Sequence, residues 1–353
     1  MSTVIASLNT ESLIHNLKFV RQTAPKSLLS AVVKDNAYGH GIEELCGRVD
    51  DLVDGYCVAT LKEGLELRQI TATKPIWVLL GFNSQNDLRR MVKFNLMPVV
   101  HSEHQIDILR QVERQVSVIF EVDTGMGRLG FHDRDANDFL RRIQAVANVE
   151  VLMSHLSCAD ETSNPYSERQ IQAFSHFADG IPIPKSIANS GGIISGDIYH
   201  LDWIRPGLLL YGVTPSEEGS SEELGLRPVM TLTSQIIAIR YMKRGDCVGY
   251  GATYVCPENM PVGIVGCGYG DGYPRSLESD AGVSLNGRFS RILGRVSMDS
   301  MAIDLRGLGT VDIGDEVILW GAGLPIEIVA KNCRTIPNEL LTRVTQRVER
   351  RWI

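Results

Sequence analysis

The sequence lacks the features that would place the protein in a membrane or on a nucleic acid. No apolar run approaches the ~20 residues that span a bilayer, and the first residues lack the basic start and unbroken apolar run of a signal peptide. There is no extended basic cluster: 35 Lys and Arg against 42 Asp and Glu give a net charge of −7, and the one basic run, 347–353, is short and contains Glu349. We therefore expect no membrane and no nucleic acid among its partners.

The chain also lacks any CxxC pair. Its seven cysteines are an odd number, spread from Cys46 to Cys333, which favours reduced thiols over a disulfide framework or a zinc site. We expect a cytoplasmic protein without a metal. A length of 353 residues with 44% apolar side chains indicates a folded chain of roughly two domains.

One pattern repeats from Ser27 to Gly212: a short β-branched apolar run is followed by a stretch with apolar residues at helical spacing. The clearest helical stretches are 61–70, 84–94 and 167–178. The apolar runs are LLSAVV (28–33), YCVAT (56–60), IWVLL (76–80), MPVVH (97–101), VSVIFEV (116–122), VEVLMSH (149–155), KSIAN (185–189) and HLDWIR (200–205).

This alternation requires a parallel sheet with right-handed crossovers, and eight units close a (β/α)8 barrel with its chemistry at the carboxyl ends of the strands. An open doubly wound sheet is the alternative, but no GxGxxG follows the first run to indicate a dinucleotide site. Beyond about Pro215 the runs are rich in Thr, Ile and Val, with glycine turns between them, which is typical of an antiparallel sheet. We therefore predict an α/β fold with an N-terminal (β/α)8 TIM-like barrel over residues 1–215. A C-terminal, mostly antiparallel β domain over residues 216–353 follows, joined by the first N-terminal strand.

Lys34 ends the first apolar run, within AVVKDNAYGHG, and so lies at the catalytic rim of the predicted barrel. A charged residue that finishes a strand is commonly a solvated cap. The residues after it favour a binding site instead, because Tyr38 and two glycines would let a ligand approach the backbone closely. A lysine desolvated at such a rim loses basicity and can form a Schiff base.

The segment AVVKDNAYGHG resembles the lysine motif of the alanine racemase family, whose cofactor is pyridoxal 5'-phosphate. Seven further motifs resemble those of the same family, in the family's order, so the resemblance covers nearly the whole chain. They are DTGMGRLGF (123–131), SHLSCADE (154–161), IANSGG (187–192), IRPGLLLYG (204–212), VGYGATY (248–254), GYGDGYPR (268–275) and GRVSMD (294–299).

A cofactor phosphate needs backbone N–H groups and hydroxyls, and the small-residue loops ANSGG and RPGLL, after the seventh and eighth runs, suit it. The resemblance implies a set of cofactor-binding residues: Lys34, Tyr38, His155, Asn189, Ser190, Arg205, Gly207 and Leu208. Among them, Arg205 is implied to face the pyridine nitrogen, with His155 beside it in a supporting role. Because a guanidinium keeps its proton, that nitrogen should stay unprotonated, which weakens the ring as an electron sink and suits an enzyme that moves one proton.

Racemisation removes the α-proton from one face of the substrate and returns a proton to the other, so it needs a base on each face. The resemblance implies that Lys34 takes the proton from D-alanine, and that Tyr250, supplied by the partner subunit of a homodimer, takes it from L-alanine. A phenol with a pKa of about 10 needs a neighbouring cation to act as a base. Arg128 matches the family arginine that provides this cation and meets the substrate carboxylate. Met298 is implied to bind the same carboxylate through its backbone N–H.

Four further residues match supporting positions of the family, three of them along its access channel: Tyr269, Arg275, Arg295 and Asp299. The chain also departs from the family. Glu121 stands where many members have a carbamylated lysine, and our hypothesis is that its carboxylate supplies the same negative charge near Arg128 directly. Asp35 replaces a small residue after the lysine, and Asn338 and Gln346 stand at positions where tyrosines occur in the family.

The resemblance therefore implies a homodimeric, pyridoxal-phosphate-dependent racemase that interconverts L-alanine and D-alanine in the cytoplasm and supplies D-alanine for peptidoglycan. The alternatives are a racemase with a broader substrate range, a basic amino-acid decarboxylase of the same fold type, and a non-catalytic pyridoxal-phosphate carrier. Tyr250 together with Arg128 argues against the decarboxylase. The carrier uses a similar barrel alone, and the well-patterned C-terminal region argues against it.

Overall fold

All eight predicted apolar runs form parallel strands of one sheet. The structure is a computed structural model that describes residues 4–112, 115–161, 163–216 and 219–353. The strands are β2 (Leu28–Val32), β3 (Gly55–Val58), β4 (Ile76–Val78), β5 (Met97–Val100), β6 (Ser117–Asp123), β8 (Asn148–Met153), β9 (Lys185–Ser186) and β10 (Trp203–Ile204). Because β5 also pairs with β6, the sheet closes on itself, and the predicted (β/α)8 barrel is confirmed. The two-residue strand β7 (Phe131–His132) lies beside β6.

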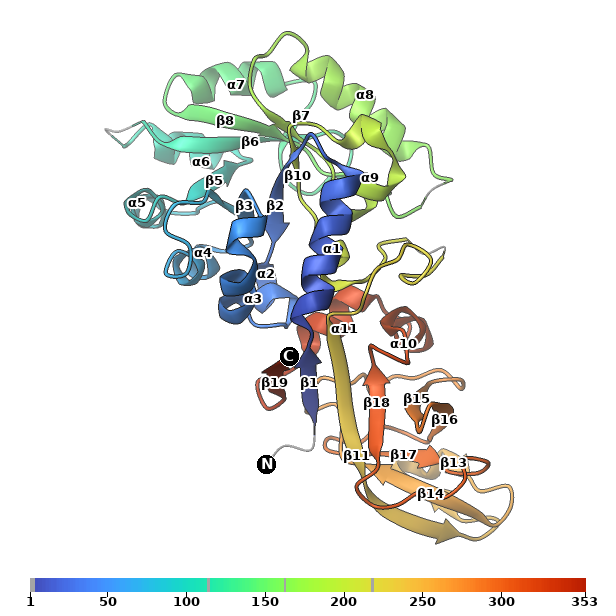
Figure 1. The fold of residues 1–353 in the computed structure, drawn as a ribbon. Helices are drawn as coiled ribbons and strands as arrows, with labels where there is room; N and C mark the ends of the chain where they lie inside the picture. The colour runs from blue at the N-terminus through green and yellow to red at the C-terminus, as the bar shows by residue number, and fades with distance from the viewer. Residues whose placement is uncertain (1–3, 113–114, 162, 217–218) are drawn as a thin grey trace.

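Helices cover the outside of the barrel, as the amphipathic stretches between the runs predict (Figure 1). They are α1 (Thr10–Thr23), α3 (Ile42–Val49), α4 (Leu61–Leu67), α5 (Gln85–Lys93), α6 (Glu103–Leu109), α7 (Ala136–Gln144) and α8 (Tyr166–Ala178), with the 3-10 turns η1 (Asp50–Leu52) and η2 (Asp197–Tyr199). Helix α4 begins at Leu61 because Thr60 and Glu63 form a capping box, in which each side chain accepts the backbone N–H of the other residue. In the described part of the chain, none of the helices combines the length and hydrophobicity that crossing a bilayer requires.

Three of the barrel strands end in short helical turns rather than in open loops. These are α2 (Lys34–Tyr38) after β2, α9 (Ser190–Ser195) after β9 and η3 (Leu208–Tyr211) after β10. The expectation of loops at ANSGG and RPGLL was wrong in this respect. Asn189 caps α9, since its side-chain oxygen accepts the N–H of Gly192 at 2.9 Å, and such a cap favours a helix even in a small-residue segment.

The second domain is a mostly antiparallel sheet of eight strands, as predicted. Its strands are β1 (Ile5–Leu8), β11 (Met230–Met242), β14 (Met260–Val265), β15 (Gly282–Leu285), β16 (Arg288–Leu293), β17 (Met301–Asp304), β18 (Glu316–Trp320) and β19 (Glu349–Trp352). A separate hairpin and two helices complete the domain: β12 (Cys247–Val248), η4 (Tyr250–Ala252), β13 (Tyr254–Val255), α10 (Ile326–Asn332) and α11 (Pro337–Arg343).

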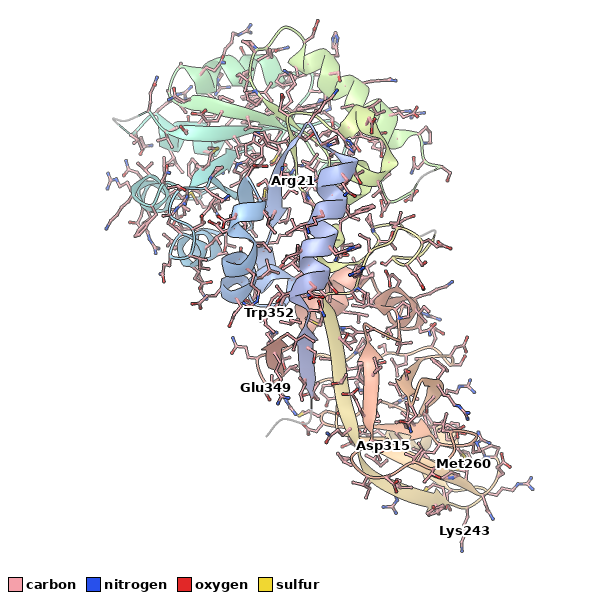
Figure 2. All side chains as sticks on the ribbon, viewed as in Figure 1. Arg21, Lys243, Met260, Asp315, Glu349 and Trp352 are labelled. Carbon is pink, nitrogen blue, oxygen red and sulfur yellow. The ribbon has the colours of Figure 1, made fainter. Side chains whose placement is uncertain are left out.

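The first strand of the chain belongs to the second sheet. Strand β1 pairs antiparallel with β11 and parallel with β19, and Figure 2 shows Glu349 and Trp352 of β19 beside it. Strand β11 pairs with β18 through Leu232–Gln235 and with β14 through Ile236–Met242. Strands β14, β17, β16, β15, β18 and β11 therefore form a closed ring, and β1 and β19 extend it toward the barrel (Figure 1).

Asn16 of α1 holds the segment that leaves the barrel for the second sheet. Its side chain is fully buried, donates to the carbonyls of Leu210 (3.2 Å) and Arg227 (2.8 Å), and accepts the N–H of Arg227 at 2.9 Å. Close packing at this point also requires Gly212, which has a φ of 76° and whose Cβ would lie 1.8 Å from the Arg227 carbonyl oxygen. Hydrogen bonds from Asn16 and close packing at Gly212 therefore fix the segment that connects the barrel to the second sheet.

Replacing Asn16 by Leu should lower the free energy of unfolding by about 2–4 kcal/mol, because the buried backbone groups of Leu210 and Arg227 lose their partners. The measurement is denaturation in guanidinium chloride, followed by circular dichroism. The control is Asn148→Ala at the exposed start of β8, for which we expect a change within about 0.5 kcal/mol. Equal midpoints for the two variants would contradict the role given to Asn16.

Candidate active site

A cavity of about 1100 Å³ lies between the carboxyl ends of the barrel strands and helices α10 and α11 of the second domain. We call it the rim cavity. The sequence-predicted residues that line it are Lys34, Tyr38, Glu121, Arg128, His155, Asn189, Ser190, Arg205, Gly207 and Leu208. Residues separated by up to 174 positions in the chain thus meet at one end of the barrel, where the chemistry of such folds gathers.

Lys34 is followed by a turn with a left-handed backbone. Asp35, Asn36, Ala37 and Tyr38, which we call the left-handed turn, have φ values between 50° and 54°. None of the four is glycine, and each such residue costs about 1–2 kcal/mol in this conformation. Strain of this size persists at binding and catalytic sites when the surroundings fix the backbone. Its result here is that Lys34 and Tyr38 both reach the rim cavity.

Contacts from both domains hold the left-handed turn. The Glu63 carboxylate that caps α4 also accepts the N–H of Asp35 at 2.7 Å. From the second domain, the Arg350 guanidinium donates to the carbonyl of Gly39 at 2.7 Å. Helix α11 packs so closely that a Cβ on Gly39 would lie 2.2 Å from the carbonyl oxygen of Leu341. The turn is therefore clamped between the barrel and the second domain.

A polar cradle lies beside the left-handed turn. The Ser190 hydroxyl oxygen accepts the N–H groups of Gly207 (2.9 Å) and Leu209 (3.3 Å). A Cβ on Gly207 would lie 2.9 Å from the Tyr38 hydroxyl oxygen, so the missing side chain leaves that hydroxyl room. Burial, assisted by the charge of Asp35, raises the pKa of Tyr38 above its ordinary value, and the phenol therefore stays a hydrogen-bond donor. Because its oxygen accepts both N–H groups, the Ser190 hydroxyl keeps its own proton to donate, and two hydroxyl donors side by side suit an anion such as a phosphate.

Arg205 forms the buried floor of the cavity and fixes the state of His155. Its guanidinium donates to the Ser186 hydroxyl at 2.5 Å, to the carbonyl of Ser154 at 2.7 Å and to His155 Nδ1 at 3.3 Å. A guanidinium can only donate, so the ring proton of His155 resides on Nε2. Burial, and then the positive charges of Arg205 and the nearby cations, hold the pKa of His155 well below its usual range. The imidazole is therefore neutral.

Glu121 is a carboxyl group buried among cations. It lies on β6, its residue is 6% exposed, and its Oε2 makes no hydrogen bond with any described residue. Burial raises its pKa to about 7, although the charges of Arg205 and Arg128 act in the opposite direction. Arg128 itself is exposed, on the loop after β6, which the carboxylate of Asp123 shapes by accepting the N–H of Gly127 at 3.1 Å. The charge of Glu121 consequently changes close to neutral pH.

The predicted site residues of the second domain do not line the rim cavity of their own chain. They are Tyr250, Met298, Tyr269, Arg275, Arg295 and Asp299. Tyr250, in η4 between β12 and β13, is 67% exposed, and Met298 is 52% exposed. Figure 1 shows β13 near the end of the second domain, far from α2. A single copy of the chain therefore does not bring Tyr250 to Lys34.

Two segments of the second domain hold the predicted carboxylate-binding loop in place. The carbonyl of Met298 accepts the N–H of Gly270 at 2.8 Å. Arg347 donates to the exposed Asp299 at 2.8 Å and pairs with the buried Asp271 at 2.9 Å. The loop that carries Met298 is thus bound to the segment 268–275 through Gly270 and to the C-terminal segment through Arg347.

Helices α10 and α11 supply walls of the cavity that were not predicted from the sequence, including Glu327 and Lys331. Asn338, which also lines it, was noted only as a departure from the family. Nor was Gln170 of α8 predicted, which is fully buried and donates to the carbonyl of His155 at 2.9 Å. No sequence signal marks these residues, because they occupy ordinary positions of amphipathic helices. Within the described residues, no group of three or more His, Cys, Asp or Glu side chains is placed to hold a metal ion.

Comparisons with known proteins agree over the whole chain. The family model described as alanine racemase, N-terminal domain, matches residues 8–215, and that described as alanine racemase, C-terminal domain, matches residues 229–352. An alanine racemase from Actinobacillus succinogenes is 44% identical over 353 residues, which cover 99% of this chain and 98% of the relative.

Solved structures give the same result. The crystal structure of a biosynthetic alanine racemase from Pseudomonas aeruginosa has a TM-score of 0.97 at 37% identity, covering 100% of both chains. The crystal structure of an alanine racemase from Bartonella henselae with covalently bound pyridoxal phosphate has a TM-score of 0.92 at 29% identity, also covering 100% of both chains. The family that the sequence motifs indicate is therefore confirmed, and the chain belongs to the alanine racemase family.

Proposed function

We propose that this chain interconverts L-alanine and D-alanine, with pyridoxal 5'-phosphate as its cofactor. The observation that carries the proposal is that one cavity at the barrel rim combines a strand-end lysine, Lys34, a buried arginine, Arg205, and a polar cradle for an anion. Membership of the alanine racemase family supports the same reaction.

The residues of the rim cavity fit the phosphate end of this cofactor. The Tyr38 hydroxyl faces the open side of Gly207, and the Ser190 hydroxyl gathers two backbone N–H groups beside it. A phosphate in the cradle would therefore meet the Tyr38 and Ser190 hydroxyls as donors, with Asn189 and Leu208 beside them. Lys34, half-buried at the edge of the same cavity, would hold the cofactor covalently.

When bound, pyridoxal 5'-phosphate joins the substrate's amine covalently and stabilises negative charge on its α-carbon. Arg205 would face the ring nitrogen, held there by the Ser154 carbonyl and the Ser186 hydroxyl. A guanidinium donates a hydrogen bond but does not give up its proton at ordinary pH. Arg205 would therefore leave the nitrogen unprotonated, which would limit charge delocalisation and favour return of the proton over side reactions. The neutral His155 keeps Arg205 in orientation without adding a second charge.

Lys34 and Tyr250 would act on opposite faces of the substrate's α-carbon. Lys34 Nζ, freed when the substrate's amine takes its place on the cofactor, would take the proton from D-alanine, and the Tyr250 hydroxyl oxygen, when ionised, would take it from L-alanine. Because Tyr250 lies outside the rim cavity of its own chain, the second base in each site comes from the partner subunit. We therefore propose a homodimer in which each copy contributes Lys34 to one site and Tyr250 to the other.

Arg128 and the backbone N–H of Met298 would bind the substrate carboxylate, Met298 again from the partner subunit. Tyr269, Arg275 and Arg295 would line the approach to it. The carboxylate of Glu121 would supply the negative charge that balances Arg128. The positive charge of Arg128 lowers the pKa of Glu121, which supports an interaction between the two side chains. The arginine would then be oriented by Glu121 above about pH 7 only, where that carboxyl is ionised.

The proposal places the reaction in the cytoplasm, with D-alanine passing to peptidoglycan synthesis. All seven cysteines are free thiols, which supports a reducing compartment. Racemisation of other L-amino acids at comparable rates would indicate a racemase of broader specificity instead.

Tyr250→Phe should lower racemisation in both directions by about 10²–10⁴-fold, because one face of the substrate loses its base. Proton NMR in deuterium oxide should then show α-hydrogen exchange of D-alanine retained and that of L-alanine lost. Tyr241→Phe, which alters another exposed tyrosine of the same domain, is the control and should match the unmodified protein. Equal loss of exchange with both enantiomers would contradict the assignment of the two faces.

The Michaelis constant for alanine should rise by about tenfold as pH falls from about 8 to about 6, because protonation of Glu121 leaves Arg128 without its counterpart. Glu121→Gln should show the high constant at every pH and no such rise. Steady-state kinetics of the two proteins across this range make the comparison. An unchanged activity and substrate affinity in Glu121→Gln would rule out the role of Glu121.

Glu121 should also make stability depend on pH. Its pKa is raised in the folded protein, from 4.5 to about 7, because the folded state favours the neutral carboxyl. The contribution of Glu121 to the free energy of unfolding is therefore fully present below about pH 4.5 and is lost as pH rises through about 7. Over this window the free energy of unfolding should fall by a few kcal/mol relative to that of Glu121→Gln, as urea denaturation of the two apoproteins would measure. Parallel curves would show that the carboxyl titrates normally.

A further inference from the structure

His40 lies directly behind the left-handed turn and outside the rim cavity. It is fully buried, and its Nδ1 lies 3.0 Å from the carbonyl oxygen of Ala37 and 2.9 Å from that of Tyr38. Carbonyl oxygens only accept, so Nδ1 carries the ring proton and donates to both. Its Nε2 has no hydrogen-bond partner among the described residues. The imidazole thus ties together two carbonyls of the left-handed turn.

The same ring belongs to a stack of three aromatic side chains. His40 stacks on Tyr211 with ring centroids 4.5 Å apart, and Tyr211 stacks on Tyr38 at 4.8 Å. The Tyr211 hydroxyl donates to the carbonyl of Val32 at 2.9 Å. Val32 ends β2, two residues before Lys34. The stack therefore links the strand that carries Lys34 to the ring that carries the cradle hydroxyl.

Burial lowers the pKa of His40 to about 4, and the nearby charge of Arg350 acts in the same direction. The ring is consequently neutral near pH 7, with its one proton committed to the left-handed turn. The non-glycine residues of this turn would be less strained in a right-handed backbone conformation. The hydrogen bonds from His40 and the stacking of Tyr211 on Tyr38 both prevent that change of conformation, because one holds the Tyr38 carbonyl and the other holds its ring.

We propose that His40 is a positioning residue that acts through Tyr211 and Tyr38, holds the Tyr38 hydroxyl at the open face of Gly207, and so sets the affinity for the cofactor's phosphate group. The inference rests on the proposed function, because it takes pyridoxal 5'-phosphate as the ligand. It concerns the phosphate end alone, since the covalent attachment belongs to Lys34.

Two substitutions each remove one of the two contacts through which His40 acts. His40→Phe keeps a ring for the stack but loses the donor to the Ala37 and Tyr38 carbonyls, whereas His40→Asn keeps a donor near the place of Nδ1 but loses the ring. Each apoprotein is titrated with pyridoxal 5'-phosphate and with pyridoxal, which lacks the phosphate, and binding is followed by absorbance. We expect the dissociation constant for pyridoxal 5'-phosphate to rise by at least about tenfold in both variants. That for pyridoxal should change by less than about twofold, because the cradle plays no part in its binding.

Tyr211→Phe provides a milder variant, which keeps the stack and removes only the hydroxyl bond to Val32. Its matched control is Tyr273→Phe in the second domain, where the equally buried hydroxyl has no hydrogen-bond partner among the described residues. We expect Tyr211→Phe, and not Tyr273→Phe, to weaken binding of pyridoxal 5'-phosphate relative to pyridoxal. This comparison decides the matter if the His40 variants do not fold.

Equal weakening of both ligands would overturn the proposal, because a merely structural residue affects the whole site. Unchanged affinity for pyridoxal 5'-phosphate would overturn it as well. These outcomes differ from failure of the proposed function, in which the unmodified protein itself would bind neither ligand.

Discussion

The left-handed turn after Lys34 is the constraint on which the rest of the site depends. A strand can bring a lysine to the rim of a barrel, but only this reversal of the backbone also brings Tyr38 back into the same cavity. The conformation is unfavourable for non-glycine residues, and hydrogen bonds hold it: Glu63 from the barrel and His40 bind the turn itself, and Arg350 from the second domain binds Gly39 directly after it. The second domain is therefore part of the active site even where it contributes no reacting group.

Burial decides the charges around this turn. Desolvation, together with the charge of Arg205, lowers the pKa of His155 and keeps its ring neutral. Desolvation raises the pKa of Tyr38, so its phenol keeps its proton. Arg205 remains a donor that cannot pass its proton on. Glu121 is the exception, since burial and the neighbouring cations oppose each other and leave its pKa near neutrality. Tyr38, His155 and Arg205 thus keep one protonation state, whereas the Glu121 carboxyl beside them changes its charge with pH.

The barrel could be predicted from sequence because each apolar run specifies its own strand, and Lys34 could be placed at the rim because it ends the first run. The left-handed turn could not, since the glycines at positions 39 and 41 are the local signal for positive φ, whereas four non-glycine residues before them adopt it under tertiary contacts. Asn189 capped a helix where small residues indicated a loop. His40 stacks on Tyr211, and Gln170 donates to the carbonyl of His155; both partners lie at least 15 positions away along the sequence, so no local pattern reveals these contacts. Tyr250 was found only through its motif, and its position outside the rim cavity of its own chain became evident only in the folded structure.

In the proposed homodimer, two copies of the chain complete each site, with Lys34 from one copy and Tyr250 from the other. This arrangement is tested most directly by unfolding Lys34→Ala and Tyr250→Phe proteins together, refolding the mixture with cofactor, and assaying racemisation. Each variant alone should retain at most about 1% of the unmodified activity. Random assortment makes half of the dimers mixed, each with one intact site, so the account predicts recovery of about a quarter of the unmodified activity. If mixed dimers form and the activity stays at the level of the separate variants, the two residues serve the same chain and the account is wrong.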